Sequence, residues 1–297
     1  MLRQFLHDFH LHTVYSDGIL QPQEVIERIA AQGIRHVAIT DHETTRALAH
    51  LNIHDLPTGI IVHTGIELDC YIGSFEVHLL GLDFDPGAPA LRTYIEEVHQ
   101  IRRERYTRLL EAINRHLGEE FMTPENTFPT VDGTWMKPHV FRRLAEHKQF
   151  QQVDPVEQYP YFREWLKEHG LTVKVPRLSI PDAIEMIHQA AGFAILAHPG
   201  YYWKHGLDLP MVLRELKEMG LDGVEVFYPY FQARAEEFPT PREAFETVRA
   251  IYHLTRDLGL KITRGSDVHL PEHVEERYPQ LQQLVSEVAD FEIRASV

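Results

Sequence analysis

The sequence predicts an α/β fold in which helices alternate with mainly parallel strands. Apolar runs of strand length, rich in β-branched and aromatic residues, recur along the chain and are separated by segments with helical periodicity. Proline opens and glycine ends several of those helical segments, as is usual for helices. The chain has 297 residues, of which 43% are hydrophobic, so it can bury a large core. This alternation fits either a barrel or an open sheet.

The predicted elements follow one another from the N-terminus. Proline opens the helical segments 22–33 and 181–192, and a third segment, 211–219, ends before a glycine. Each of these segments lies between two predicted strands, which is the arrangement that makes neighbouring strands parallel. The predicted strands are residues 5–12, 36–41, 60–67, 75–82, 193–198, 223–228 and 261–265.

One long region breaks the alternation. Residues 86–179 show no convincing strand, but a long helical pattern is followed by shorter ones at 141–146 and 161–169. We therefore expect a main domain made of residues 1–85 and 180–297, with a helical insertion at 86–179 that stands over one face of it. The apolar positions of the long pattern are Leu91, Ile95, Val98, Leu109, Ile113 and Leu117.

The composition argues against several classes of protein. Lysine and arginine number 29 against 44 aspartates and glutamates, a formal net charge of −15 that disfavours binding to a long nucleic-acid duplex but allows a local basic pocket. The single cysteine, Cys70, excludes an intramolecular disulfide and a cysteine-rich zinc site. No stretch approaches the roughly 18 apolar residues of a membrane span or forms a signal peptide. We expect a cytoplasmic protein with no membrane contact and no obligate protein partner.

Metal-binding side chains gather at the ends of the predicted strands. The chain has 20 histidines, and histidine is the commonest metal ligand. Barrel and open-sheet α/β enzymes build their active sites at the C-terminal ends of strands, so this placement predicts a metal site. The residues that close or follow strands are His10, His12, Asp41, His42, Glu67, His198, Asp267 and His269, and His78 and Glu225 lie inside strands.

The spacing of these residues sharpens the prediction. Side chains of a strand alternate between its faces, so His10 and His12 point the same way and can bind one ion. Asp267 and His269 have the same relation if the chain stays extended there. Asp41 and His42 are adjacent and point apart, so we expect His42 to be a ligand and Asp41 to orient a neighbouring imidazole.

Each motif alone also has an ordinary structural explanation. A His-x-His pair is often a surface feature, and "AHPG" at residues 197–200 is also typical of a strand followed by a turn. Placement of all these motifs at successive strand ends favours the metal site.

The chain resembles the PHP family, the polymerase and histidinol phosphatase superfamily of metal-dependent phosphoesterases, in an ordered set of motifs that spans residues 9–269. It is most similar to the branch whose inserted helical domain acts on nucleotide phosphates. The resemblance implies a distorted (β/α)7 barrel that carries three divalent ions, and Mn, Fe and Zn all suit a mixture of imidazole and carboxylate ligands. The motifs are "FHLHTVYSDG", "AITDHET", "TGIEL", "VHLLG", "LAHPG", "GVEVFYP" and "GSDVH".

The resemblance also implies which residues hold the ions. The ligands of the first ion would be His10, His12, Glu67 and Asp267. Glu67 would bridge to a second ion, whose other ligands would be His78 and His198. The ligands of the third ion would be Asp17, His42 and His269. The residues expected to act in catalysis are Glu67, His198, Asp267 and His269, and those expected to support ligands are Asp41 and Glu225.

The expected reaction is hydrolysis of a phosphate ester by metal-activated hydroxide, because clustered metals both generate a nucleophile and neutralise phosphoryl charge. The expected substrate is a small nucleotide, either a nucleoside 3′,5′-bisphosphate or the 5′ end of a short oligonucleotide. A histidinol-phosphatase-like activity and a non-catalytic, metal-stabilised PHP module are the alternatives. The sequence contains no "GxSxG" elbow, "GxGxxG" loop or Walker A motif.

Substrate recognition is predicted from a basic stretch of the insertion, "KPHVFRRLAE", residues 137–146. His139 and Arg142 are three residues apart and share a helix face that could present positive charge to a phosphate, although a solvated basic face has the same pattern. The resemblance to the family adds Lys137 to the candidate substrate-binding residues. An arginine is expected at this position in the family. Arg264 stands before "GSD", where a small residue is usual, and either contacts phosphate or pairs with a carboxylate.

Overall fold

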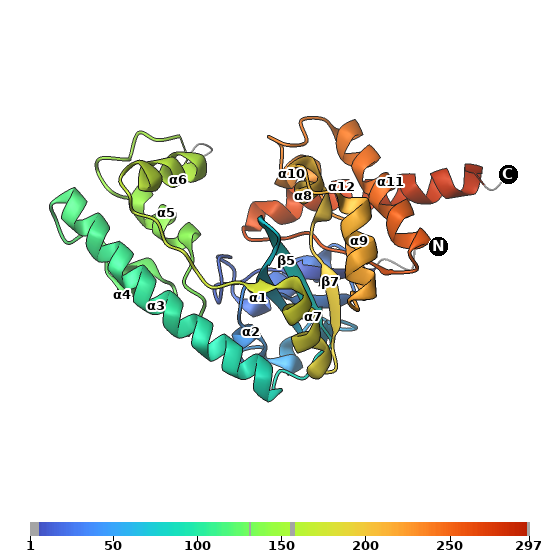
Figure 1. The fold of residues 1–297 in the computed structure, drawn as a ribbon, viewed down its shortest axis with the longest axis horizontal. Helices are drawn as coiled ribbons and strands as arrows, with labels where there is room; N and C mark the ends of the chain where they lie inside the picture. The colour runs from blue at the N-terminus through green and yellow to red at the C-terminus, as the bar shows by residue number, and fades with distance from the viewer. Residues whose placement is uncertain (1–5, 131, 155–157, 296–297) are drawn as a thin grey trace.

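A distorted barrel of strands forms the centre of the computed structural model, which describes residues 6–130, 132–154 and 158–295 (Figure 1). The predicted α/β fold is confirmed. One sheet has the strand order β1-β2-β3 and the other has the order β6-β4-β5-β7-β8-β9. The strands are β1 (His7–Leu11), β2 (His36–Ile39), β3 (Ile61–His63), β4 (Gly65–Ile72), β5 (Phe75–Leu82), β6 (Leu178–Ser179), β7 (Phe193–Leu196), β8 (Gly223–Phe227) and β9 (Lys261–Arg264).

Two isolated bridges join the sheets into a ring. Leu11, at the end of β1, pairs with Val268, which follows β9, and His42, which follows β2, pairs with Glu67 on β4. Around the ring the order is therefore β1, β2, β4, β5, β7, β8 and β9, with β3 and β6 as short additional strands. Both bridges lie at or beside residues predicted to bind metal. The contacts that close the barrel therefore also bring these residues together.

The predicted strand 60–67 is wrong as a single element, because it contains all of β3 and the start of β4. The chain bends at Thr64, whose hydroxyl donates to the carbonyl of Phe84 at 2.8 Å and whose carbonyl accepts from the N–H of Asp83 at 2.9 Å. Gly65 permits the close approach that follows, since a Cβ there would lie 2.5 Å from the carbonyl oxygen of Ile39.

β5 is the antiparallel member of the ring. Ile72 pairs with Phe75 across a two-residue turn, in which Gly73 has a φ of +57°, a conformation that suits hairpin turns. β5 then pairs antiparallel with β7, whereas β7, β8 and β9 are mutually parallel. Of the first predicted strand, residue 5 lies outside the described residues.

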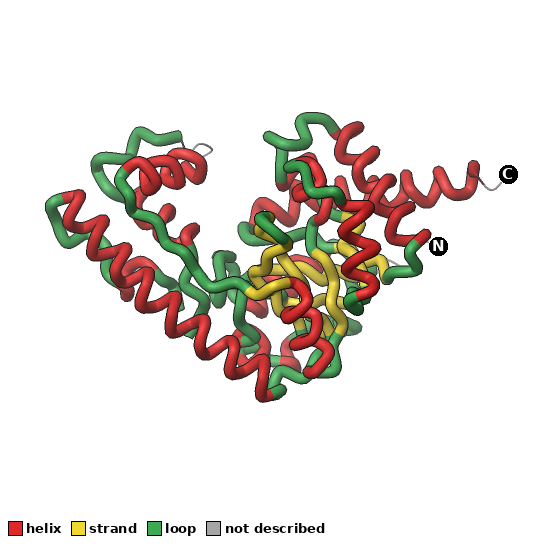
Figure 2. Tube along the Cα trace, viewed as in Figure 1, coloured by secondary structure: helices red, strands yellow, loops and turns green. Residues whose placement is uncertain are grey.

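Helices alternate with the strands along the chain and pack around the outside of the barrel (Figure 2). Proline stands at the start of α1, α7, α9 and α11, and Ser179, Asp208 and Thr240 cap the last three through hydrogen bonds from backbone N–H groups. The helices of this part are α1 (Pro22–Ala31), α2 (Arg46–Ala49), the 3₁₀ turn η2 (Ile53–Asp55), α7 (Ile180–Gln189), α8 (Pro199–Lys204), α9 (Leu209–Glu218), α10 (Tyr230–Ala233), α11 (Pro241–Asp257) and α12 (Pro271–Ala295).

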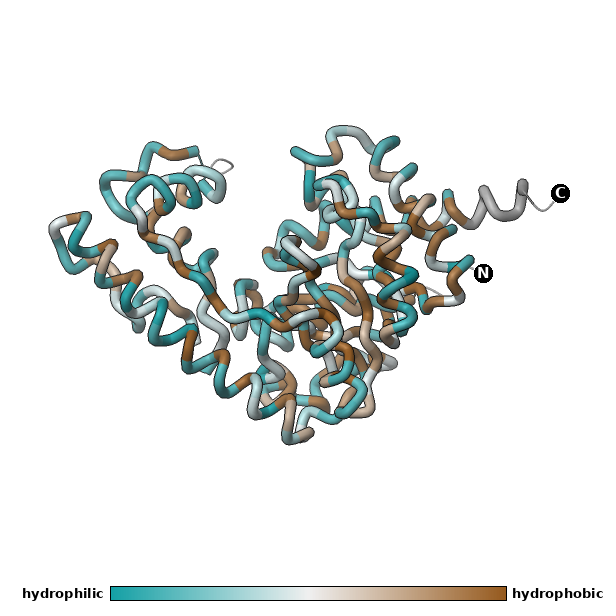
Figure 3. Tube along the Cα trace, viewed as in Figure 1, coloured by the Kyte–Doolittle hydropathy of each residue, from teal (hydrophilic) through white to brown (hydrophobic). Residues whose placement is uncertain are grey.

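The helices between β5 and β6 form an arm beside the barrel and occupy the stretch where we expect an insertion (Figure 1). They share a hydrophobic cluster of their own, which includes Tyr106, Ile113 and Phe162 and is separate from the clusters of the barrel. Figure 3 shows hydrophobic positions recurring along the long helix, as expected for a helix with one buried face. These helices are α3 (Pro89–Leu117), α4 (Pro124–Thr127), α5 (Lys137–Ala145) and α6 (Gln158–Glu168).

Among the described helices, none is both long enough and apolar enough to cross a membrane.

Replacing Ile113 by alanine should destabilise the arm. The side chain is 0% exposed, so its truncation should lower the free energy of unfolding by about 2–5 kcal/mol. Urea unfolding followed by tryptophan fluorescence measures this, because Trp135 and Trp165 belong to the same cluster. Arg108→Ala, at an exposed position of the same helix, should stay within about 0.5 kcal/mol of wild type. Equal effects of the two substitutions would show that the arm does not depend on this cluster.

Candidate metal centre

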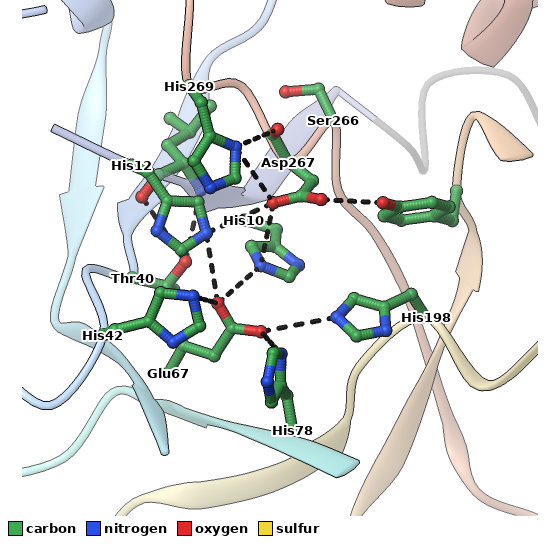
Figure 4. A network of polar contacts seen from close by, with 12 residues as sticks. His10, His12, Thr40, His42, Glu67, His78, His198, Ser266, Asp267 and His269 are labelled. Atoms are coloured by element: carbon green, nitrogen blue, oxygen red, sulfur yellow. Dashed lines mark hydrogen bonds and ion pairs between the residues drawn. The ribbon is translucent and has the colours of Figure 1, made fainter. Parts of the chain in front are cut away.

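The predicted ligands converge at one end of the barrel (Figure 4). They come from strand ends or from the loops that follow, although His78 lies within β5 and Glu67 within β4. Within the described chain, the ligand atoms form overlapping groups in which all members lie within 4.8 Å of one another. These groups are His12–Asp17–His42–His269, His10–His12–Glu67, His42–Asp69–His78 and Glu67–His78–His198.

The carboxylate of Glu67 occupies the middle of the cluster and is almost fully buried. Its Oε2 faces three imidazoles and its Oε1 faces two others, so one carboxylate connects both halves of the cluster. This is the geometry expected of a bridging ligand. The distances from Oε2 are 3.1 Å to His10 Nε2, 3.1 Å to His12 Nε2 and 3.3 Å to His42 Nε2. Those from Oε1 are 2.7 Å to His78 Nδ1 and 3.4 Å to His198 Nε2.

Two aspartates complete the cluster on the side of β1 and β9. Asp267 Oδ1 lies 3.2 Å from His12 Nε2 and 3.5 Å from both His10 Nε2 and His269 Nδ1. Asp17 Oδ1 lies 3.1 Å from His269 Nε2 and 3.6 Å from His12 Nδ1. Asp267 has a φ of +54°, so the chain is not extended there, yet its side chain still meets that of His269.

Several buried polar atoms of the cluster lie close to one another but make no hydrogen bond of acceptable geometry with a described residue. Leaving such atoms unsatisfied is costly, and nearly all buried polar atoms in native proteins have partners. Imidazole nitrogens and carboxylate oxygens are the donor atoms that Mn, Fe and Zn prefer, so the residues present fit a divalent metal centre. The unpartnered atoms are His12 Nε2, His42 Nδ1, Glu67 Oε1, His78 Nδ1 and His198 Nδ1.

The carboxylates of the cluster are ionised and so attract cations. Burial opposes ionisation of Glu67 and Asp267, but the surrounding imidazoles hold the pKa of both carboxyls well below the usual range. Burial lowers the pKa of His198 to about 3, which leaves this imidazole neutral. Burial acts in the same direction on His12 and His42, but neighbouring carboxylates raise their pKa values to about 9 and about 10. The carboxylates therefore hold protons on these two imidazoles near pH 7, and a metal ion would bind them only as those protons leave.

Asp41 does not orient an imidazole directly, which corrects the prediction from its adjacency to His42. Its carboxylate instead accepts hydrogen bonds from Thr13 N–H at 2.7 Å, Thr13 Oγ1 at 2.6 Å and Ser16 Oγ at 2.6 Å. Ser16 Oγ lies 3.3 Å from His12 Nδ1, so Asp41 reaches that ring only through the serine. The fully buried Asp41 therefore fixes the loop that leads to Asp17.

Glu225 occupies the supporting position that we predicted. One of its oxygens lies 2.9 Å from His10 Nδ1, and the other accepts a hydrogen bond from the backbone N–H of His198 at 2.8 Å. Gly265 is required beside it, because a Cβ there would lie 1.9 Å from Glu225 Oε1 and 2.4 Å from the Cβ of His10. The glycine in "RGSD" therefore makes room for the contact between Glu225 and His10.

Asp69 belongs to the cluster but was not predicted. Its Oδ1 lies 3.1 Å from His42 Nδ1 and 3.6 Å from His78 Nε2. Its Oδ2 pairs at 2.5 Å with Nη2 of Arg102 on α3, and the arginine is only 2% exposed. The sequence carries a signal for both residues: Asp69 follows Glu67 by two residues in a strand, and Arg102 interrupts the apolar face of α3.

Tyr228 was also not predicted. Its hydroxyl donates a hydrogen bond to Asp267 Oδ2 at 2.7 Å, and both residues are buried. The hydroxyl therefore fixes the orientation of the aspartate.

The four residues predicted to bind substrate lie in different environments. Lys137, at the start of α5, is half-buried, and burial lowers its pKa. Arg142 donates through Nη2 to the carbonyl of Asp17 and so contacts the metal-site loop. Arg264 is buried, and its guanidinium carbon lies 5.3 Å from the centre of the Tyr278 ring on α12.

His139 does not present the positive charge that we expected. It is 3% exposed, and its Nδ1 accepts a hydrogen bond from the N–H of Met136 at 3.2 Å. Burial and the neighbouring Arg142 lower its pKa to about 4, so it is neutral near pH 7. Its contacts are those of a capping residue at the start of α5.

Substituting Arg102 by methionine should strongly destabilise the protein. The change leaves Asp69 buried without its cation, and breaking a buried ion pair costs about 3–5 kcal/mol. Urea denaturation measures the loss. Arg103→Met is the matched control, since Arg103 is the next residue of the same helix and is exposed. Similar losses for both variants would contradict a specific role for the pair.

Substituting Glu225 by glutamine should weaken metal binding. The amide cannot serve both His10 and the His198 backbone as the carboxylate does, and loss of such a supporting contact costs about 10- to 100-fold in metal affinity. Competition for Mn²⁺ or Zn²⁺ with a coloured chelator measures the affinity. Glu246→Gln, on the exposed side of α11, should bind metal like wild type. Unchanged affinity in Glu225→Gln would remove Glu225 from the centre.

Comparisons with known proteins agree with this geometry. The family model described as "PHP domain" matches residues 8–169. A 5′-3′ exoribonuclease of Haemophilus influenzae is 30% identical over 89% of this chain and 90% of its own length. A 3′,5′-nucleoside bisphosphate phosphatase of Chromobacterium violaceum is 30% identical over 89% of this chain and 87% of its own. The structure of an amidohydrolase from Chromobacterium violaceum, solved with bound sulfate, has a TM-score of 0.70 at 25% identity and covers 89% of this chain and 88% of its own. The chain therefore belongs to the PHP domain family.

Proposed function

We propose that this chain is a metal-dependent phosphoesterase that hydrolyses phosphate esters of small nucleotides. The observation that carries the proposal is the buried Glu67 carboxylate, with five imidazoles around it and unpartnered nitrogen atoms beside it. The names of the relatives support the substrate class, because one acts on nucleoside 3′,5′-bisphosphates and another is an exoribonuclease. We propose a bisphosphate or the 5′ end of a short RNA as substrate.

The residues of the cluster would hold up to three divalent ions, Mn, Fe or Zn. We assign His10, His12 and Asp267 to one ion, His78 and His198 to a second and Asp17, His42 and His269 to a third, with Glu67 shared between the first two. Divalent ions bound there would supply a water nucleophile of lowered pKa and neutralise charge on the phosphoryl oxygens.

The chain's own residues hold this arrangement rigid. Glu225 fixes His10 and the backbone of His198, and the hydroxyl of Tyr228 holds Asp267. Such supporting contacts keep the imidazole rings in one orientation and one tautomer. A preorganised site does not have to reorganise when charge develops on the reacting phosphoryl group.

Substrate would enter where the cluster is least buried. The side chain of His78 is 30% exposed and that of His269 is 21% exposed, whereas His10 and His12 are fully buried. We therefore place the reacting phosphate at the edge between His78 and His269, with the other expected catalytic residues, Glu67, His198 and Asp267, close to it. Lys137 and Arg142 of the arm are the candidates that we keep for binding the remainder of the substrate.

Removing the metal or His12 should abolish phosphate release. Protein reconstituted with manganese should release phosphate from a nucleoside 3′,5′-bisphosphate or a 5′-phosphorylated short RNA faster than from histidinol phosphate or an aryl phosphate. Chelation should stop the reaction. His12→Gln should lower kcat/KM by more than about 100-fold, because loss of a mere supporting residue already costs up to that factor.

His54→Gln is the matched control, since His54 is exposed and lies in the turn η2. It should keep full activity. Preference for histidinol phosphate would favour the histidinol-phosphatase alternative. No hydrolysis by the metal-loaded protein, together with a lower melting temperature of His12→Gln, would instead favour a structural metal module.

A further inference from the structure

A partly buried arginine, Arg234, packs against Tyr201 near the metal centre and has no ionic partner among the described residues. It follows α10, the short helix after β8. Its Nε is buried, and its guanidinium makes no hydrogen bond or ion pair with any residue that the structure describes. The guanidinium packs against the aromatic ring of Tyr201 on α8. The guanidinium carbon lies 4.9 Å from the centre of that ring. Holding a charged group away from water without a counterion is costly, so this position favours the binding of an anion.

The residues around Arg234 contact the metal centre directly. Tyr228 donates its hydroxyl to Asp267, and the hydroxyl of Tyr202 accepts a hydrogen bond from the backbone N–H of His78 at 2.8 Å. The rings of both tyrosines lie 5.4 Å from the ring of His198. Burial opposes the charge on Arg234, but Tyr228 and Asp267 raise its pKa, so the guanidinium stays charged. Tyr201, against which the guanidinium packs, donates its backbone N–H to the carbonyl of His198 at 3.1 Å, so the positive charge is close to the centre on the barrel side.

The backbone fixes the position of this arginine. Its N–H donates to the carbonyl of Tyr230 at 2.8 Å, and its own carbonyl accepts from the N–H groups of Glu237 at 3.1 Å and Phe238 at 2.9 Å. The hydroxyl of Tyr230 in turn accepts from the N–H of Gly200 at 2.7 Å, which connects α10 to the start of α8. Arg234 is thus held by the same elements that carry His198.

We propose that Arg234 binds the phosphoryl group of the substrate, with Tyr201 packed against its guanidinium. The proposal rests on the proposed phosphoesterase function. A phosphate oxyanion supplies the direct hydrogen-bonding partner that no described residue gives this guanidinium, and the planar group can donate two parallel hydrogen bonds to it. Arg234 reaches the phosphate from the barrel, whereas Lys137 and Arg142 belong to the arm.

The test measures binding of inorganic phosphate to the manganese-loaded full chain by titration calorimetry. Arg234→Gln should weaken phosphate binding by about tenfold or more, as expected for loss of hydrogen bonds between charged groups. Arg234→Lys should recover part of the affinity, because it keeps the charge but not the paired donors. Arg242→Gln, an exposed position on α11, should bind phosphate like wild type.

Manganese content and melting temperature separate a binding role from a structural one. Both should be unchanged in Arg234→Gln and Arg234→Lys, and KM for a nucleoside bisphosphate should rise. Equal phosphate affinity in wild type and Arg234→Gln would overturn the proposal while leaving the phosphoesterase function intact. Phosphate binding that depends on Arg234, without hydrolysis of any ester, would instead overturn the proposed function alone. Loss of manganese in both variants would show that Arg234 supports the centre rather than the substrate.

Discussion

The carboxylate of Glu67 is the feature on which the rest of the site depends. A buried carboxylate is stable only if cations or hydrogen-bond donors surround it, and here imidazoles from four other strands or their loops do so. Those strands can deliver their histidines to one point only if the barrel closes. The bridge between His42 and Glu67 is one of the two contacts that close it. The fold and the candidate metal centre are therefore consequences of the same set of pairings.

A second layer of contacts connects this centre to the rest of the chain. Glu225 serves both His10 and the backbone of His198, so β1, β7 and β8 are fixed relative to one another at the site. Asp69 makes a different connection, because it faces His42 while pairing with Arg102 of the arm. The long helix α3 is thus attached to the centre by a buried ion pair as well as by its connections in sequence. Any change that displaces α3 would also disturb the environment of His42.

The sequence predicted the parts of this site that follow from local rules. His10 and His12 share a strand face, and the placement of His198 and Asp267 at or after strand ends predicted their convergence. Glu67 was predicted at the end of a strand, but it lies near the start of β4. The rules fail where contacts arise between elements distant in sequence. Asp41 was expected to face an imidazole, but the hydroxyls of Thr13 and Ser16 lie nearer and bind it. Arg102 and Arg234 each depend on how a helix packs against the barrel, which periodicity within one segment does not describe. The bend at Thr64 was missed for the same reason, since its partners are at residues 83 and 84.

The overall charge and the local charge of the protein have opposite effects on an anionic substrate. With a net charge of −15, the chain as a whole repels polyanions. At physiological ionic strength, exposed charges more than about 8 Å apart are largely screened, whereas buried groups are screened much less. A phosphate close to the site would therefore respond mainly to Arg142, Arg234 and any bound metal ions. A long duplex would extend beyond these cations and be repelled by the negative net charge of the protein. This charge distribution favours a small nucleotide or the end of a short strand over a continuous nucleic acid.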